Sequence, residues 1–409
     1  MIVMCIVELP RSRSVPDFQL VILAGVKMAT MRIAGEEGAL EYFYEQYRSK
    51  CDQFGDDPHF LIVQILEQAL RNGSNLTCLH LNGRNLSSND KIADDDVFAL
   101  SESLATFPDA PFVLIDLSLN NIGNNGAKAL GVMLKSTQSI ANLSLHANEI
   151  GELGGLALAH ALEGQKTVTD LNLSDNPIGD SGICAIGRVI GKPGSVLKRL
   201  NLNNTEMEIG AVVQIAKSLQ TNDSVEKLLI SNARIASLED EVSVHLSAML
   251  SFNKTLIMLD LSKHRIRDEG VEWLIRGLKS NETLKYLSLR CNQIGSDGAI
   301  HIAENLGNLS LISLDLSGNR LIDQGGKAIA SSLHNNRTLQ RLDLSYTSLG
   351  EQGLIALSNV VGSRNIGPLT ALMLWGNNFT PLVGESWRLS LSIEGALSEC
   401  DFQPYIQPE

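Results

Sequence analysis

Cysteine pairs, an excess of positive charge and catalytic motifs are all missing from this sequence of 409 residues, and each absence excludes a class of protein. The six cysteines include no Cys-x-x-Cys pair, so neither a zinc site nor a disulfide framework is indicated. Scattered cysteines of this kind favour a reducing, intracellular compartment. No G-x-x-x-x-G-K-[ST], H-E-x-x-H or G-x-S-x-G motif occurs. We therefore expect no enzyme: no catalytic or metal-binding residue, no cofactor and no small-molecule substrate.

Positive charge is in deficit along the whole chain. Lys and Arg total 33 against 46 Asp and Glu, which gives a formal net charge of -13 at pH 7. Because this charge repels phosphate, we expect no direct binding to nucleic acid, and a protein partner fits better. Long apolar runs are lacking as well, since segments 1–7 and 20–26 are far shorter than the roughly 20 residues that cross a bilayer. Membrane insertion is therefore not expected.

One pattern, L-x-x-L-x-L-x-x-N-x-I/L, recurs along the chain and is clearest in the units that begin at Leu284 and Leu311. Its starts are mostly 27 to 29 residues apart and lie at Leu76, Phe112, Ile140, Val168, Leu197, Val225, Leu256, Leu284, Leu311, Leu339 and Leu369. The alternation in L-x-L predicts a short strand with one buried face. Apolar residues four apart, such as Ile302 and Leu306, then predict a helix.

A single strand and helix cannot bury their apolar sides alone, whereas stacked identical units share one continuous core. Helices are roughly 10–12 Å wide and strands lie about 4.8 Å apart, so the stack must curve with its helices outside. We predict a helical cap at 56–75, an array of about eleven units at 76–380, and a C-terminal cap and tail at 381–409. Residues 1–55 are predicted to be a partly disordered leader, and it stays open whether residues 1–30 belong to the mature protein.

The period of about 28 residues, with helices of the form G-x-x-x-L-a-x-x-L, resembles the ribonuclease-inhibitor-like family of leucine-rich repeat proteins from Leu76 to about Phe379. The resemblance implies an α/β horseshoe with a parallel sheet on the concave face and helices on the convex face. It also implies a protein-binding scaffold in the cytoplasm, the nucleus or the nucleolus. Two other roles known in the family stay open: a GTPase-activating protein like that of Ran, which would use Arg84, and a regulatory subunit of ciliary axonemes.

Three residues of each unit should point into the concavity: the x of L-x-L and the two residues after its second Leu. In the first and middle units these positions are mostly small or polar. In the last units they include residue types that are enriched at binding hot spots. The predicted protein-binding residues are Lys263, Tyr286, Arg290, Tyr346, Met373 and Trp375. The alternative is that Trp375 covers the final repeat and Arg290 pairs with a neighbouring acid.

Acidic residues occupy the central L-x-L position of four predicted strands, at Asp116, Asp260, Asp315 and Asp343. Stacked like charges must be screened or paired, so we add Asp260, Asp315 and Asp343 to the predicted site as possible receivers of a basic partner segment. The alternative to this interpretation is that the acids form a metal site or a catalytic carboxylate dyad. The acids belong to different units and share their row with no nearby His or Cys, which argues against that alternative.

Several units depart from the pattern. The Asn is replaced by Arg84, Thr205, Ala233, His264 or Thr347, and we expect a looser turn at each of these positions. His264 lies between basic residues, which predicts either a contact to an acidic partner or simply a solvated turn. On the helices, a recurring Ala becomes Trp273 and His301 in two adjacent units. This change predicts either a second site on the helical flank or a residue that covers core.

Overall fold

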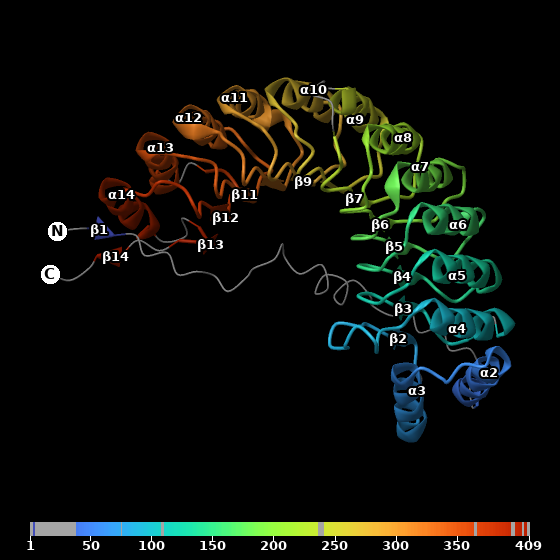
Figure 1. The fold of residues 1–409 in the computed structure, drawn as a ribbon. Helices are drawn as coiled ribbons and strands as arrows, with labels where there is room; N and C mark the ends of the chain where they lie inside the picture. Colours follow the sequence, from blue (N-terminus) through green and yellow to red (C-terminus); the bar gives the residue numbers. More distant parts are fainter. Residues whose placement is uncertain are drawn as a thin grey trace.

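The computed structural model describes residues 3–4, 38–74, 76–107, 110–235, 241–363, 366–393, 397–402 and 405–406. Most of the predicted leader, and part of the lengthened unit at 235–245, lie outside these residues. The described chain forms an arc of stacked units, with helices on the outer side and strands on the inner side (Figure 1). This arrangement confirms the predicted α/β horseshoe.

In the described residues, twelve parallel strands form one sheet in strict sequence order from β2 to β13. Neighbouring strands pair in register, so that Leu143 of β4 lies opposite Leu171 of β5 and Ile115 of β3. The strands are β2 (Cys78–His80), β3 (Leu114–Asp116), β4 (Asn142–Ser144), β5 (Asp170–Asn172), β6 (Arg199–Asn201), β7 (Lys227–Leu229), β8 (Met258–Asp260), β9 (Tyr286–Ser288), β10 (Ser313–Asp315), β11 (Arg341–Asp343), β12 (Ala371–Met373) and β13 (Glu399–Cys400).

One helix follows each strand from β2 to β12 and packs on the helices of the neighbouring units. These helices are α4 (Asp94–Thr106), α5 (Asn124–Ser136), α6 (Glu152–Leu162), α7 (Gly179–Ile190), α8 (Ile209–Leu219), α9 (Glu241–Phe252), α10 (Asp268–Leu278), α11 (Ser296–Asn305), α12 (Ile322–Leu333), α13 (Glu351–Gly362) and α14 (Pro381–Leu391). The leucines of L-x-L and the apolar side of each helix bury one continuous core between the two layers.

A ladder of asparagines holds neighbouring units together at the turns that follow β3, β4, β5, β9, β10 and β12. The Asn292 amide donates to the carbonyls of Leu289 in its own unit, at 2.8 Å, and of Leu261 in the preceding unit, at 3.0 Å. Its Oδ1 accepts the N–H groups of His264 and Ile266 at 2.9 and 3.0 Å. The side chain thus satisfies four backbone groups that the turn would otherwise leave buried and unpaired.

Where threonine replaces the asparagine, the turn is rearranged. Of the bonds that the asparagine makes, Thr205 and Thr347 keep the one from the side chain to a carbonyl of their own unit, at 2.7 and 2.6 Å. The Thr347 hydroxyl also lies 3.3 Å from Asn377 Oδ1 in the next unit. In the preceding unit, Gly179 and Ile322 instead donate their backbone N–H to the threonine carbonyls. Both donors have a positive φ, of 69° and 51°. The same substitution therefore produces the same altered helix start at two places in the array.

A second asparagine ladder runs along the opposite side of the stack, and the sequence reading missed it. The amide of Asn253 donates at 2.7 Å to the carbonyl of Leu219 at the end of the preceding helix, and its Oδ1 accepts the N–H of Leu256. Corresponding bonds are made by Asn222, Asn281 and Asn336. The tripeptide that begins at Asn253 matches the Asn-x-Thr pattern of glycosylation acceptors. Because Asn253 is buried and bonded within the ladder, it is not accessible for glycosylation.

The two ends of the core are covered by atypical elements. At the N-terminal end, α3 (Phe60–Asn72) lies within the predicted cap, but α2 (Ala39–Phe54) also packs there, with Phe43 and Tyr47 fully buried. The cap therefore starts earlier than position 56. At the C-terminal end, Trp387 of α14 is fully buried with its ring 4.9 Å from that of Phe402. A short antiparallel pair, β1 (Val3–Met4) with β14 (Tyr405–Ile406), lies beside α14 (Figure 1).

Candidate interaction surface on the concave face

The acids at the centre of L-x-L each accept a backbone hydrogen bond at the end of their own strand. Oδ1 of Asp116, Asp315 and Asp343 accepts the N–H of the residue two positions on, at 3.0, 2.8 and 2.9 Å respectively. Asp260 makes the same bond at 2.9 Å, and Asn172 makes it at 3.1 Å. This bond favours an Asp or Asn at the position, although Ser144, Leu229 and Ser288 occupy it in other units. The charge of the Asp residues remains on the concave face in addition.

Asp315 and Asp343 form a carboxylate pair. They lie opposite each other on β10 and β11, which are paired in register. Burial and the Asp343 charge raise the pKa of Asp315 to about 6, although hydrogen bonds from Ser317 and the Arg290 charge act in the other direction. Part of the carboxylate population at Asp315 is therefore protonated just below neutral pH. The prediction of stacked like charges applies to this pair.

Two aromatic side chains lie together at the C-terminal end of the concave face. The Trp375 indole N–H donates to the Tyr346 hydroxyl at 2.7 Å, and the Tyr346 side chain is 57% exposed. Gly376, with φ of 74°, lies directly against the tyrosine ring, where an added Cβ would come within 2.3 Å of a ring carbon. Glycine at this position therefore lets the tyrosine ring approach the backbone of the last turn closely.

The other predicted residues are distributed unevenly. Lys263 and Arg290 are exposed on adjacent units, where the Lys263 N–H donates to the Arg290 carbonyl at 2.9 Å, and Tyr286 is exposed on β9. Met373, in contrast, is only 6% exposed and cannot serve as a contact residue. The chain after β13 reaches this end of the sheet, where the Asp401 carboxylate accepts the N–H groups of Leu374 and Trp375 at 2.7 and 3.0 Å.

His264 is not part of a basic surface spot. Its side chain is 2% exposed and takes the place of the ladder asparagine, with Nε2 lying 2.6 Å from the Ile230 carbonyl oxygen. Among the described residues Nδ1 has no hydrogen-bond partner, and burial lowers the pKa of the ring. The imidazole is therefore a neutral, structural side chain. Lys263 and Arg265, on either side of it, are exposed.

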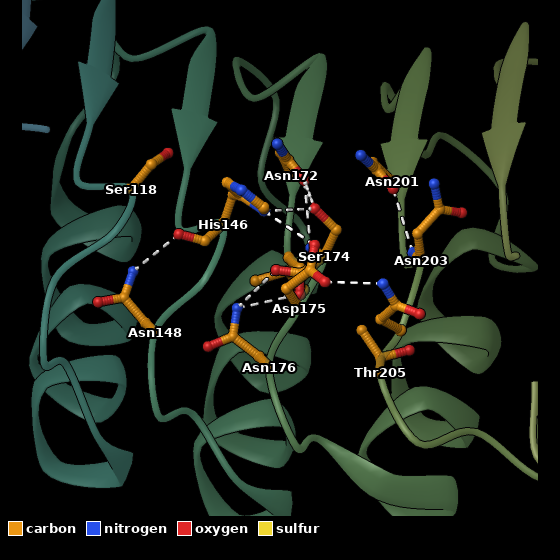
Figure 2. Close-up of polar contacts among 12 residues, drawn as sticks. Ser118, His146, Asn148, Asn172, Ser174, Asp175, Asn176, Asn201, Asn203 and Thr205 are labelled. Atoms are coloured by element: carbon orange, nitrogen blue, oxygen red, sulfur yellow. Dashed lines mark hydrogen bonds and ion pairs between the residues drawn. The ribbon is translucent and has the colours of Figure 1, made fainter. Parts of the chain in front are cut away.

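The middle units contain a connected cluster of polar side chains, where the sequence pattern predicted no site. His146 Nδ1 lies 2.9 Å from the Ser174 hydroxyl and 3.1 Å from a carboxylate oxygen of Asp175 (Figure 2). Asp175 accepts a bond from Asn204 at 2.7 Å, and Asn204 accepts one from Asn232 at 2.6 Å. The hydrogen bond to Asp175 raises the pKa of His146, and the His146 side chain lowers the pKa of Asp175.

This cluster does not have the geometry of a catalytic triad. In a triad, the serine and the acid bond to different nitrogens of the histidine, whereas here both lie at Nδ1. The cluster is better described as a ladder across neighbouring units. Its residues could have been found in the sequence, because Asp175, Asn204 and Asn232 occupy the same position of successive units.

Arg84, the residue that a GTPase-activating role would use, is exposed in the turn after β2, and its N–H donates to Asn82 Oδ1 at 2.9 Å. The expectation that no histidine shares the row of the central acids is wrong at one place, because His80 lies opposite Asp116 on β2 and β3. Within the part of the chain that the structure describes, however, no three His, Cys, Asp or Glu side chains are grouped as metal ligands. In the same residues, no helix has both the length and the apolar character to cross a membrane.

The chain is similar to known repeat proteins. A family model described as a leucine-rich repeat matches residues 114–131, 164–187, 252–274, 280–303, 307–330 and 335–358. Mouse leucine-rich repeat-containing protein 34 is 29% identical over 181 residues, which cover 44% of this chain and 43% of the mouse protein. Mouse NACHT, LRR and PYD domains-containing protein 4C is 34% identical over 158 residues, or 38% of this chain and 16% of that protein. A solved internalin from Listeria monocytogenes has a TM-score of 0.43 at 17% identity, covering 80% of this chain and 87% of the internalin.

The match therefore spans less than half of the mouse protein 34. Rat protein 34 gives a comparable match, 29% identical over 192 residues, with 46% of each chain covered. The sequence segments from which we predict a resemblance to the same protein are LDLSKHRIRDEG at Leu259–Gly270, LWGNNF at Leu374–Phe379, the lengthened unit at 235–245, and FQPYIQPE at the C-terminus. The last two lie partly outside the described residues.

Proposed function

Because this chain is built of leucine-rich repeats stacked into one solenoid, an architecture that generally binds other proteins, we propose that it is a non-enzymatic scaffold. Its protein partner lies against the C-terminal part of the concave face. The residues that would contact it are Lys263, Tyr286, Arg290, Tyr346 and Trp375, with Asp260, Asp315 and Asp343 between them.

The observation that carries this proposal is the hydrogen-bonded aromatic pair, in which Tyr346 is exposed and Trp375 is half-buried. Tyr and Trp side chains contribute most to protein interfaces when a partner covers them, because each buries a large apolar area at little conformational cost. Burial of an indole is costly when its N–H loses water without gaining a partner. The Trp375 N–H already donates to the Tyr346 hydroxyl. A partner can therefore cover both rings without leaving that donor unsatisfied.

The charges around the pair favour a partner with both acidic and basic groups. Lys263 and Arg290 are exposed toward the middle of the array, while Asp343 lies on β11, in the same unit as Tyr346. A partner would pair acids with the two cations and a basic side chain with the carboxylates. Complementary charges of this kind set orientation and specificity more than affinity.

The test is quantitative capture of partners by the purified full chain. The Tyr346→Ala/Trp375→Ala variant removes the aromatic pair. Ser118→Ala/Ser144→Ala removes another hydrogen-bonded pair of the concave face, whose hydroxyls are 2.8 Å apart near the N-terminal end. We expect the same proteins to be captured by wild type and by the serine variant, and to be lost with the aromatic variant. Equal capture by all three would refute this site, and failure of wild type to retain any protein directly would refute the scaffold.

We also propose an intracellular location, in the cytoplasm, the nucleus or the nucleolus. In the described residues, the five cysteines, Cys51, Cys78, Cys184, Cys291 and Cys400, are all free thiols. Free thiols throughout an array are consistent with a reducing compartment. Imaging of the tagged full chain in cells tests this location, and secretion into the medium would contradict it.

A further inference from the structure

Aromatic side chains are concentrated in the N-terminal cap and the first repeat. Six of the ten phenylalanines of the chain lie between positions 43 and 112. Phe43 and Phe112 are buried against each other and belong to the core. Phe54 and Phe98 are also in contact, but they are 40% and 43% exposed. Covering the core therefore accounts for the first pair, while the second leaves a large apolar area in water.

Phe54 and Phe98 lie at one end of the seam between α2 and α4, which pack together at the N-terminal end of the arc (Figure 1). Their ring centres are 4.8 Å apart, edge to face. Further along the seam, Lys50 Nζ lies 3.8 Å from a carboxylate oxygen of Glu102, so the two helices run antiparallel. Phe54 is the last residue of α2, about one turn beyond the buried Cys51. Its ring therefore lies at the edge of the packed surface.

Exposed acids flank this aromatic pair. Asp52 and Asp56 lie on either side of Phe54 in the sequence, and Asp95 lies in the first turn of α4, three residues before Phe98. Among the described residues, none of these three acids forms an ion pair. The one printed cation of the seam, on α2, is instead bound to an acid further along α4. The aromatic pair thus has an uncompensated negative rim.

The acids of the two helices converge at this end of the seam. Burial raises the pKa of Asp96, and the nearby charges of Asp95 and Asp56 raise it further. The Ala93 N–H, which donates to Asp96, and the His59 charge act in the other direction. Asp95 of α4 and Asp56 beyond α2 therefore both lie within electrostatic reach of one carboxyl group.

Helix stability explains only one of the exposed acids. Asp95 lies in the first turn of α4, where a negative charge is favourable. Asp52 lies in the last turn of α2, and Asp56 follows its Gly55 cap, where the helix dipole disfavours a negative charge. No basic residue offsets these two acids in that turn. An electrostatic cost to α2 thus lies directly beside the exposed aromatic pair.

We propose that Phe54 and Phe98 form the centre of a docking site for a basic amphipathic helix of a second protein. An apolar side chain of that helix covers the two rings, and its lysine or arginine side chains reach Asp52, Asp56 and Asp95. A helix fits better than an extended strand, because the backbone groups of α2 and α4 are bonded within their own helices and offer no sheet edge. The acids disfavour a helix with a negative polar face.

This docking site lies at the opposite end of the array from the aromatic pair of the concave face (Figure 1). The proposal therefore does not depend on the function proposed above. The alternative is that the contact between Phe54 and Phe98 only stabilises the cap. That role alone predicts a change in thermal stability when the rings are removed, and no change in binding of a helix.

A labelled peptide of leucine and lysine, with its leucines on one face of a helix, provides the probe. Binding to the full chain is followed by fluorescence anisotropy at about 0.15 M salt. A peptide in which glutamate replaces every lysine has the same apolar face, and we expect it to bind at least roughly tenfold more weakly. Phe54→Ala/Phe98→Ala should weaken binding of the lysine peptide roughly tenfold, because the rings that it covers are lost.

Two variants control for the loss of apolar surface. Val132→Ala/Leu153→Ala removes two exposed apolar side chains from α5 and α6 and should bind the lysine peptide like wild type. Tyr346→Ala/Trp375→Ala removes the aromatic pair of the concave face and should also bind it like wild type. Thermal unfolding of each variant shows whether the fold is kept.

Removal of charge separates docking from a structural role. Asp52→Asn/Asp56→Asn should weaken binding of the lysine peptide about threefold and at the same time raise thermal stability, because the dipole of α2 no longer opposes two charges. A purely structural role predicts unchanged binding. Glu149→Gln/Glu152→Gln is the matched control, since it removes two exposed acids near the start of α6.

The proposal is overturned if wild type binds neither peptide or binds both equally, or if the phenylalanine variant binds the lysine peptide as well as its apolar control does. Equal weakening by the two acid variants would overturn it as well, because it indicates only a general attraction to a chain with a net charge of -13. A wild-type dimer that the phenylalanine variant converts to a monomer, measured by sedimentation, would assign the rings to a second copy instead.

Discussion

Asp315 and Asp343 lie opposite each other on adjacent parallel strands, and the pKa of Asp315 is raised to about 6. The two carboxylates stay on the concave face because each also binds the N–H group at the end of its strand. Folding therefore places two like charges side by side to satisfy two backbone donors. The charge repulsion has a consequence for stability that can be measured.

The first prediction concerns the pH dependence of stability. A carboxyl whose pKa is near 3.9 in the unfolded chain and about 6 in the native state binds more protons when folded. The free energy of unfolding should then fall as pH rises from about 4 to 6. Asp315→Asn should remove this slope and stabilise the protein at pH 7 by about 1 kcal/mol. Urea unfolding at several pH values measures both effects.

The asparagine substitution at position 315 should keep the local hydrogen bonds. Asn172 holds the equivalent position on β5 and binds the N–H and the hydroxyl of Ser174, as Asp315 binds those of Ser317. Asp116→Asn is the control, because residue 116 lies between His80 and Ser144 instead of beside a second acid. An identical gain in stability for both variants would contradict the role of the carboxylate pair.

The second prediction concerns the His146–Asp175 pair. Because the native pKa of His146 is raised, its contribution is complete below the unfolded value near 6.5 and is lost as pH rises through the native value. His146→Gln should therefore destabilise the protein more at pH 6 than at pH 8. Both side chains are partly exposed, so the difference should be below about 1 kcal/mol. A nuclear magnetic resonance titration of His146 that gives an ordinary or lowered pKa would contradict the pairing.

The third prediction concerns the asparagine ladder. Asn292→Ala leaves four backbone groups without their side-chain partner, and we expect a loss of about 2 to 3 kcal/mol in the free energy of unfolding. Asn292→Thr should cost less, because Thr205 and Thr347 show that a hydroxyl still binds the carbonyl of its own unit. Equal losses for alanine and threonine would argue that the bonds to the preceding unit carry all of the stabilisation.

Much of the fold could be predicted from the sequence, because the same pattern of buried and turn residues recurs in many units. The leucines of L-x-L and the ladder asparagine recur in most units, so each strand and turn is specified by several copies. Less could be predicted where the pattern occurs once. The helix α2 has no copy elsewhere, and its burial against α4 depends on Phe43 and Tyr47, which belong to no repeat.

The candidate site was predictable only in part, for a related reason. The pattern indicates which positions face the concavity, and Tyr346 is exposed there as expected, while Trp375 is half-buried. It does not indicate what the chain beyond the last repeat covers. Met373 has the right position, but Asp401 and the strand before it return to the same end of the sheet. Contacts between side chains of different units, such as those of His146, likewise depend on the stacking distance.

The last prediction concerns His264, which occupies a ladder position without completing its bonds. Nε2 replaces the amide donor toward Ile230, while Nδ1 is buried without a partner in the described residues. Because burial lowers its native pKa, the native state binds fewer protons than the unfolded chain, and stability should fall as pH drops below about 6.5.

His264→Asn should remove that loss and raise stability at neutral pH by about 1 kcal/mol, since the amide can bridge two units as Asn292 does. His264→Ala leaves a cavity and is the matched control, which should destabilise the protein at every pH. If the asparagine variant is no more stable than the alanine variant, an amide at position 264 does not make the bonds that Asn292 makes, and the prediction is wrong.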